Sequence, residues 1–378
     1  MTLSNISRRG FLGASLGAAA VGTVGLQNAQ DADSSLASPN NFWNRIPLLA
    51  ARQHVIYSYS GLVPPAELFE IISQGTIGGI IFFGENISSI AQIASVAQQL
   101  QEASLAGAAK RRLMLKVDQE GGYVNRLPGG PKESAAVVGR ATDPAAAAAA
   151  QASTVAIVLA TAKMNSDLAP VLGVYRKYDD FLDHYDRSFS QDPAIVSNCG
   201  ESFIRTLNNA GVISSAKHFP GLGAAPQEAN TDLVPVTIDL TEAELRRIDL
   251  FPYHSAIKAG VPMVMPSWAI YPAFGPAVPA GFSKKIVSGL LRNELGFKGV
   301  TVTDALEAGS LKPFGGPAER AVKALQAGND LLCCSSRSLA QGEEAAQGLV
   351  SGFKGGKLDL LTLLRSQQRI SKLASKIS

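Results

Sequence analysis

Charged side chains follow several short apolar runs in this 378-residue sequence, at the positions where buried strands would end. Asp118 follows one run, the pair Lys217-His218 belongs to a second, and Asp304 closes a third. Carboxylates can carry protons or act as nucleophiles, and a lysine at such a place can form a Schiff base with a carbonyl substrate. Each residue alone is equally compatible with an ion pair at a strand end. Together they predict a reactive site.

The composition excludes other kinds of site. The chain has 34 Lys and Arg against 31 Asp and Glu, a formal net charge of +3, and only 17% of its residues are charged. Without a strong basic field, electrostatically driven binding to nucleic acid is disfavoured. Four histidines and three cysteines occur at no spacing typical of a metal site, so we expect no bound metal. The adjacent Cys333 and Cys334 are predicted to be buried strand residues.

These reactive residues need a framework that brings strand ends together. From about residue 50 the chain alternates short apolar runs with longer segments compatible with helices. The runs are His54–Tyr59, Gly79–Gly84, Leu113–Glu120, Met164–Leu172, Val212–Gly221, Pro262–Trp268, Gly299–Ala305 and Asp330–Ser335. Eight buried parallel strands are the number that a (β/α)8 TIM-like barrel requires. We therefore predict an α/β fold with one barrel domain over residues 41–378, and keep a doubly wound open sheet as the alternative.

Helix start and stop signals agree with this pattern. Thr241-Glu242-Ala243-Glu244 has the order of a capping box before a helix that could run toward Gly260. Asp192-Pro193 offers an N-cap followed by proline at the first helical position. Ser283 precedes a segment that should end near Gly296, and the last helical stretch is expected over Leu358–Ile377.

Residues 1–40 differ from the rest and predict export. Ser7-Arg8-Arg9-Gly10-Phe11-Leu12 precedes a small, apolar run from Phe11 to Leu26, and then a polar linker. The paired arginines resemble the twin-arginine signal, which implies a periplasmic or extracellular protein. A transmembrane anchor is the weaker alternative, because the run falls short of the roughly 20 strongly apolar residues that a span needs. We expect no stable membrane anchor.

Several motifs in order along the chain resemble glycoside hydrolase family 3, in particular its single-barrel bacterial β-N-acetylhexosaminidases. The matching segments are Gly78 to Phe83, Val117 to Gly122 through Arg126, Asp167 to Val171, Asp186 to Phe189, Lys217 to Gly223, and Val302 to Asp304. The resemblance implies a carbohydrate substrate, no cofactor, and a retaining mechanism with Asp304 as the nucleophile. It also implies that Asp118, Arg126, Arg187, Lys217 and His218 bind the sugar hydroxyls, through charge-assisted hydrogen bonds.

The sequence departs from these relatives where their general acid should lie. In them the Lys-His-Phe-Pro-Gly segment is followed by an Asp-x-His dyad, whereas here the corresponding residues are Glu228 and Asn230. Glu228 could supply the proton, Asp232 could serve if the loop folds differently, or the protein could be a carbohydrate-binding member with weak or no hydrolysis. Trp268 stands where some relatives carry histidine, and a lone tryptophan at a strand end is more often packing than a sugar platform.

The loss of the dyad also widens the range of substrates. Terminal N-acetylglucosamine stays one candidate, another β-linked sugar is a second, and export suggests a cell-wall glycan as the natural source. Schiff-base chemistry at Lys217, with Asp304 or Asp118 as the proton carrier, is the alternative from a different reaction class.

Overall fold

Eight short parallel strands form a closed barrel at the centre of the computed structural model, which describes residues 47–275 and 277–377. They are β1 (Val55–Tyr57), β2 (Gly79–Ile81), β3 (Leu115–Val117), β6 (Ser166–Asp167), β7 (Ile213–Phe219), β8 (Met263–Pro266), β9 (Val300–Ala305) and β10 (Leu331–Cys333). Each lies inside one of the eight predicted runs. Strand β1 pairs with both β2 and β10, which closes the sheet. The predicted barrel is therefore confirmed, and an open doubly wound sheet is excluded.

The barrel interior is filled by side chains and is not a pore. One buried cluster joins Ile56 of β1, Ile81 of β2, Met265 of β8 and Val302 of β9, which can meet only inside a closed sheet. Two larger clusters lie between the strands and the surrounding helices. Strand residues thus alternate between the interior and the helical shell, and each strand is buried on both faces.

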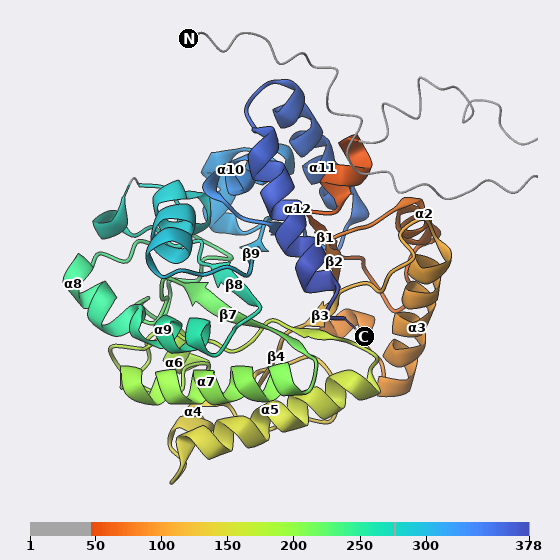
Figure 1. The fold of residues 1–378 in the computed structure, drawn as a ribbon. Helices are drawn as coiled ribbons and strands as arrows, with labels where there is room; N and C mark the ends of the chain where they lie inside the picture. Colours follow the sequence, from red (N-terminus) through yellow and green to blue (C-terminus); the bar gives the residue numbers. More distant parts are fainter. Residues whose placement is uncertain (1–46, 276, 378) are drawn as a thin grey trace, which may run out of the picture. The chain divides into compact units, whose positions relative to one another are not determined.

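Helices surround the barrel (Figure 1). They are α2 (Ala66–Gln74), α3 (Ile90–Ala106), α4 (Ala135–Gly139), α5 (Pro144–Thr161), α6 (Phe181–His184), α7 (Pro193–Asn209), α8 (Glu242–Glu244), α9 (Phe251–Lys258), a π-helical segment (Lys285–Glu294), α10 (Pro317–Ala327), α11 (Leu339–Lys354) and α12 (Leu360–Ala374). By length and composition alone, α5 could cross a membrane, and it packs against α7 in this shell.

The helix signals in the sequence match the structure. The Thr241 hydroxyl accepts from the Glu244 backbone N–H while the Glu244 carboxylate accepts from the Thr241 N–H, which is the predicted capping box. The helical stretch that follows is interrupted by a π-helical turn and resumes as α9. The Asp192 carboxylate caps α7, as predicted. The predicted export segment, residues 1–40, lies outside the described residues.

The two ends of the barrel are built differently. At the carboxyl end, β3 leads directly into an antiparallel hairpin made of β4 (Gln119–Gly121) and β5 (Val124–Asn125). At the amino end, Ile370 and Leu373 of α12 join the interior cluster and close the barrel. The interior of the barrel is therefore closed by a helix at the amino end, and a pocket opens at the carboxyl end.

One interior residue has no partner for its charge. Lys116 lies in β3 between Leu115 and Val117, which face the helical shell, so its side chain points into the barrel. It is fully buried, and its Nζ makes no hydrogen bond with any described residue. Burial lowers the pKa of Lys116 to about 8.

We predict that Lys116→Met stabilises the protein. At pH 7 the free energy of unfolding should rise by about 1–3 kcal/mol, because methionine occupies similar space without a buried ammonium group. The pKa of Lys116 is lowered from its ordinary value of 10.5. Its buried charge therefore destabilises the folded state fully below about pH 8, and this destabilisation disappears above about pH 10.5. The advantage of the variant should shrink over that interval.

Urea unfolding curves measured from pH 7 to pH 10.5 test this prediction. Lys132→Met, at an exposed lysine, is the matched control and should change the free energy of unfolding by no more than about 0.5 kcal/mol. A Lys116→Met protein less stable than the wild type at pH 7 would show that Lys116 makes a favourable interaction.

Candidate active site

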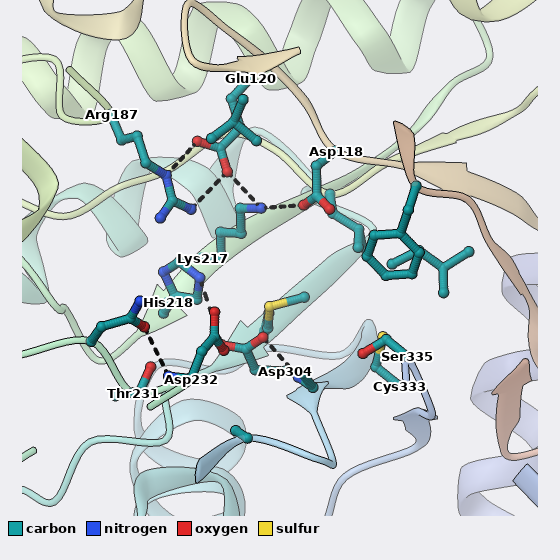
Figure 2. Close-up of a pocket in the computed structure, with 18 of the residues that line it drawn as sticks. Asp118, Glu120, Arg187, Lys217, His218, Thr231, Asp232, Asp304, Cys333 and Ser335 are labelled. Carbon is teal, nitrogen blue, oxygen red and sulfur yellow. Dashed lines mark hydrogen bonds and ion pairs between the residues drawn. The ribbon is translucent and has the colours of Figure 1, made fainter. Parts of the chain in front are cut away.

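A pocket of about 390 Å³ opens at the carboxyl ends of the strands. Every sugar-binding residue predicted from the sequence lines it, together with Asp304. These residues are Asp118, Arg126, Arg187, Lys217 and His218. They are far apart in the sequence, and the closed barrel brings them together because all parallel strands end at the same rim. Figure 2 shows Asp118, Arg187, Lys217, His218 and Asp304 around the cavity.

A buried ion cluster forms one wall of the pocket. The Lys217 Nζ lies 2.7 Å from the Asp118 Oδ1 and 2.7 Å from the Glu120 Oε1. The Arg187 guanidinium donates two bonds to Glu120, Nε to Oε2 and Nη2 to Oε1, both at 2.8 Å. The cluster therefore joins two cations to two carboxylates, with Glu120 bridging both cations (Figure 2).

The charges within this cluster together shift the pKa values of Lys217 and Glu120 more than burial does. Burial alone would lower the pKa of Lys217, but the carboxylates of Asp118 and Glu120 raise it above its ordinary value. Burial alone would raise the pKa of Glu120, but the cations of Arg187 and Lys217 hold it well below its ordinary range. Lys217 is thus a protonated hydrogen-bond donor, which argues against Schiff-base chemistry because that reaction needs a neutral amine.

The residues beside the cluster hold its backbone in place. The Asp167 Oδ1 accepts from the Gln119 N–H at 3.0 Å, which links the ends of β6 and β3. The Gln119 side chain in turn accepts from the Leu127 N–H at 2.9 Å and donates to its carbonyl at 3.1 Å. Arg126 belongs to this segment, lines the pocket, and has a buried Nε without a partner among the described residues. Asp167 is thus a structural residue, and Arg126 is open to a ligand.

Asp304 lies near the end of β9, on the pocket wall opposite the ion cluster. Its Oδ1 accepts from the Ala305 N–H at 2.7 Å, which fixes the carboxylate relative to its own strand. The Trp268 Nε1 donates to the Ala305 carbonyl at 2.8 Å, and Trp268 is 1% exposed. The packing role expected for Trp268 is confirmed, and this contact supports the strand end that carries Asp304.

His218 lies between the ion cluster and Asp304. Its Nε2 is 3.8 Å from the Asp304 Oδ2, and its Nδ1 is buried without a partner among the described residues. Burial lowers the pKa of His218 well below its ordinary value, and the charges of Lys217 and Arg187 add to the shift. The imidazole is therefore neutral and can donate from one nitrogen and accept at the other.

The segment from Leu222 to Asp232 carries the candidate acids. Glu228 and Asp232 are both exposed to solvent, but Asp232 lines the pocket together with Asn230 and Thr231, and Glu228 does not. The Asp232 carbonyl accepts from the Gly309 N–H at 2.7 Å, which ties this segment to the chain after β9. A Cβ at Gly309 would lie 2.2 Å from the Leu233 carbonyl oxygen, so this close approach requires glycine. The fold thus places Asp232, not Glu228, at the pocket.

Asp232 and Asp304 form a pair of neighbouring carboxyl groups. Burial raises the pKa of Asp304 to about 7, and the negative charge of Asp232 adds to the shift. Burial also raises the pKa of Asp232, with the charge of Glu307 adding to it. Two adjacent carboxyl groups with raised pKa values retain a proton near neutral pH, since ionising both costs repulsion. One group can then act as a nucleophile or base while the other acts as an acid.

Two features of the pocket were not singled out from the sequence. Glu120 stood in a recognised motif, yet its bridging role depends on Arg187, 67 residues away. Glu307 lines the pocket and accepts from the Ser335 hydroxyl at 2.7 Å and the Gln341 amide at 3.0 Å. Its position three residues after Asp304 was the available clue.

The described residues contain no group of three or more His, Cys, Asp or Glu side chains arranged to hold a metal ion. Cys333 lines the pocket floor, and both Cys333 and Cys334 are buried free thiols, as predicted. Burial raises the pKa of both thiols. The chemistry that this pocket offers is therefore that of carboxyl, amine, guanidinium and imidazole groups.

Comparisons with known proteins agree with the fold. The model of the glycosyl hydrolase family 3 N terminal domain matches residues 54–373. An uncharacterized secreted glycosyl hydrolase from Arthroderma benhamiae is 44% identical over 329 residues, which cover 87% of this chain and 93% of that protein.

Two further similar proteins carry more specific names. Beta-hexosaminidase A from Pseudoalteromonas piscicida is 32% identical over 83% of this chain and 56% of its own length. A solved structure, a glycoside hydrolase family 3 beta-N-acetylglucosaminidase from Paenibacillus sp., has a TM-score of 0.80 and 29% identity over 87% of this chain. The chain covers 62% of that structure, so it spans only part of both relatives.

The ion cluster generates a stability prediction. Glu120→Gln should lower the free energy of unfolding by about 3–5 kcal/mol at pH 7, because it leaves the buried cations of Lys217 and Arg187 without their shared carboxylate. The pKa of Glu120 is held below its ordinary value of 4.5, so its contribution is present above that pH and is lost as the pH falls further.

Chemical denaturation at pH 7 measures this effect. Glu133→Gln makes the same change at an exposed carboxylate and should leave the free energy of unfolding within about 0.5 kcal/mol of wild type. Equal stability of the Glu120→Gln variant and the control would mean that the cluster contributes nothing to the fold.

Proposed function

The chain belongs to glycoside hydrolase family 3, and we propose that it is an exported enzyme that cleaves β-linked sugars with retention of configuration. The proposal rests on the pair Asp304 and Asp232. This pair lies across one pocket from a cluster of charged side chains that can form hydrogen bonds with sugar hydroxyls. Export rests on the predicted leader and on the secreted relative from A. benhamiae.

The terminal sugar would bind against the ion cluster. Asp118 can accept hydrogen bonds from sugar hydroxyls, while Lys217, Arg187 and Arg126 can donate them. Because Lys217 and Arg187 are already fixed by Glu120, little side-chain freedom would be lost on binding. The neutral His218 would contact the sugar near Asp304.

In the first step, the Asp304 carboxylate would attack the anomeric carbon from the face opposite the aglycone. The bond between that carbon and the glycosidic oxygen breaks, and the departing oxygen takes a proton from the general acid. In the second step, water attacks the glycosyl ester, and the deprotonated acid removes a proton from this water. The sugar is released with its original configuration, and both carboxyl groups return to their starting states.

The general acid is proposed to come from the Leu222–Asp232 segment. Asp232 is the carboxyl group of this segment that lines the pocket, and its raised pKa suits an acid at neutral pH. Glu228 occupies the position of the relatives' aspartate but does not line the pocket in this structure, so it could act only after the segment moves. Asp232 is therefore the first candidate, and Glu228 is the second.

The substrate class follows from the relatives. Proteins named beta-hexosaminidase and beta-N-acetylglucosaminidase are among the similar proteins, so a terminal β-linked N-acetylglucosamine is the first sugar to test. A cell-wall glycan is the proposed natural source because of the predicted export. The competing function is carbohydrate binding with little or no hydrolysis, since the Asp-x-His dyad is absent.

Asp304→Ala should abolish turnover of 4-nitrophenyl β-glycosides, including the N-acetylglucosaminide, by about 10³-fold or more in kcat/KM. Azide should restore part of the activity by entering the space left by the carboxylate, and the product should be the α-glycosyl azide. Release of nitrophenol and the configuration of the product are the two measurements. If wild-type turnover of these activated substrates does not exceed the Asp304→Ala background, the protein is a binder and not a hydrolase.

Asp232→Asn should lower kcat by about 10²- to 10⁴-fold for substrates with poor leaving groups, and much less for dinitrophenyl glycosides, which need little protonation. For wild type, kcat/KM should fall as the pH rises above about 7, because the proton held by the Asp232 and Asp304 pair is lost. The variant should lose this alkaline decline.

Glu228→Gln is the matched variant on the same segment and should behave like wild type on both substrates. The opposite pattern, a large loss with Glu228→Gln and none with Asp232→Asn, would assign the acid to Glu228 and would show that the segment moves during the reaction.

A further inference from the structure

A second pocket, of about 270 Å³, lies at the amino end of the barrel, away from the proposed active site. Its walls come from three parts of the chain that meet there. Ile257 to Pro262 precede β8, Gly296 to Val300 lead into β9, and the last turns of α12 supply the third side. Because these residues precede the strands, the pocket opens on the opposite end of the barrel from Asp304.

The charged groups around this pocket are all cationic. Lys298, Arg369, Lys372 and Lys376 line it, and no Asp or Glu side chain does. Arg369 donates to the buried Asp330, at 2.7 Å between Nη2 and Oδ1, but Arg292 binds the same carboxylate at 2.7 Å. Two guanidinium groups thus share one carboxylate. The three exposed lysines have no carboxylate partner among the described residues, although the whole chain carries a net charge of only +3.

This convergence is not explained by helix capping alone. Lysines near the C-terminus of α12 favour the helix by opposing the partial negative charge there. This accounts for Lys372 in the last turn and for Lys376 just beyond the helix. Lys298, however, comes from the separate segment before β9. Its approach brings like charges together, which is unfavourable unless an anion neutralises them.

The rest of the lining is apolar. Ile257, Val261, Phe297 and Leu373 form most of it, and a fully hydrated ion gains nothing from such surface. A ligand suited to the whole pocket would place an acidic group among the lysines and an apolar group against these side chains. We propose that this pocket binds an amphiphilic anion, a phosphate or carboxylate group attached to an acyl chain or other apolar body.

The probe for this proposal is dodecyl phosphate below its micelle-forming concentration, measured by isothermal titration calorimetry on the full chain. Inorganic phosphate tests the charge alone, and dodecyl maltoside tests the chain alone. Lys298→Gln/Lys372→Gln/Lys376→Gln should weaken dodecyl phosphate binding by about tenfold or more, because charge-assisted hydrogen bonds are lost. Raising the salt concentration should weaken wild-type binding, because exposed charges are screened.

A triple variant at exposed lysines elsewhere, Lys132→Gln/Lys354→Gln/Lys357→Gln, changes the net charge equally and should bind like wild type. Circular dichroism establishes that both variants are folded. Absence of dodecyl phosphate binding, or equal binding by wild type and the pocket variant, would overturn the proposal. Inorganic phosphate or dodecyl maltoside binding as tightly as dodecyl phosphate would also overturn it.

Vesicles distinguish the two sources of such a ligand. Sedimentation with phosphatidylglycerol vesicles but not phosphatidylcholine vesicles, lost in the pocket variant, would identify a lipid headgroup as the ligand. Binding of monomeric dodecyl phosphate without vesicle binding would identify a free amphiphile. Both results support the pocket, and neither depends on the proposed glycosidase activity.

Discussion

The contact between the Lys217 ammonium and the carboxylates of Asp118 and Glu120 is the interaction on which the pocket depends. It joins β7 to the end of β3 and, through Glu120, to Arg187 on the loop after β6. Two carboxylates compensate this buried cation for the loss of water. The same charges that hold these three segments together line the pocket, and in the proposed function they would also contact the sugar.

The opposite wall of the pocket carries two carboxyl groups, those of Asp304 and Asp232. Asp304 and Asp232 lie close enough for their negative charges to interact, and burial raises the pKa values of both. The Ala305 N–H donates to the Asp304 carboxylate, and the Gly309 N–H donates to the Asp232 main-chain carbonyl and so holds the backbone of that residue in place. One wall therefore consists of paired opposite charges, and the other consists of two carboxyl groups whose pKa values are raised.

Much of this arrangement could be predicted from local sequence. Short apolar runs predicted the barrel, because buried parallel strands need continuous apolar sequence. Charged residues at the ends of these runs predicted the site, because the carboxyl ends of the strands meet at one rim. Asp118, Lys217, His218 and Asp304 were found for the same reason, whereas Arg126 and Arg187 were expected from the resemblance to the family. All six line the pocket. The capping residues Asp192 and Thr241 could also be predicted from the sequence, because a cap depends on neighbours within one helical turn.

Only the tertiary structure decided which carboxyl group of the Leu222–Asp232 segment reaches the pocket. Position in the sequence pointed to Glu228, but the loop is held by contacts with the distant Gly309 and Ser310, and the folded loop lines the pocket with Asp232 and not with Glu228. The bridging role of Glu120 and the convergence of Lys298 with α12 likewise join residues far apart in the chain. Strand and helix patterns are set by local periodicity, whereas a loop's side chains take their positions from whatever the rest of the fold packs against them.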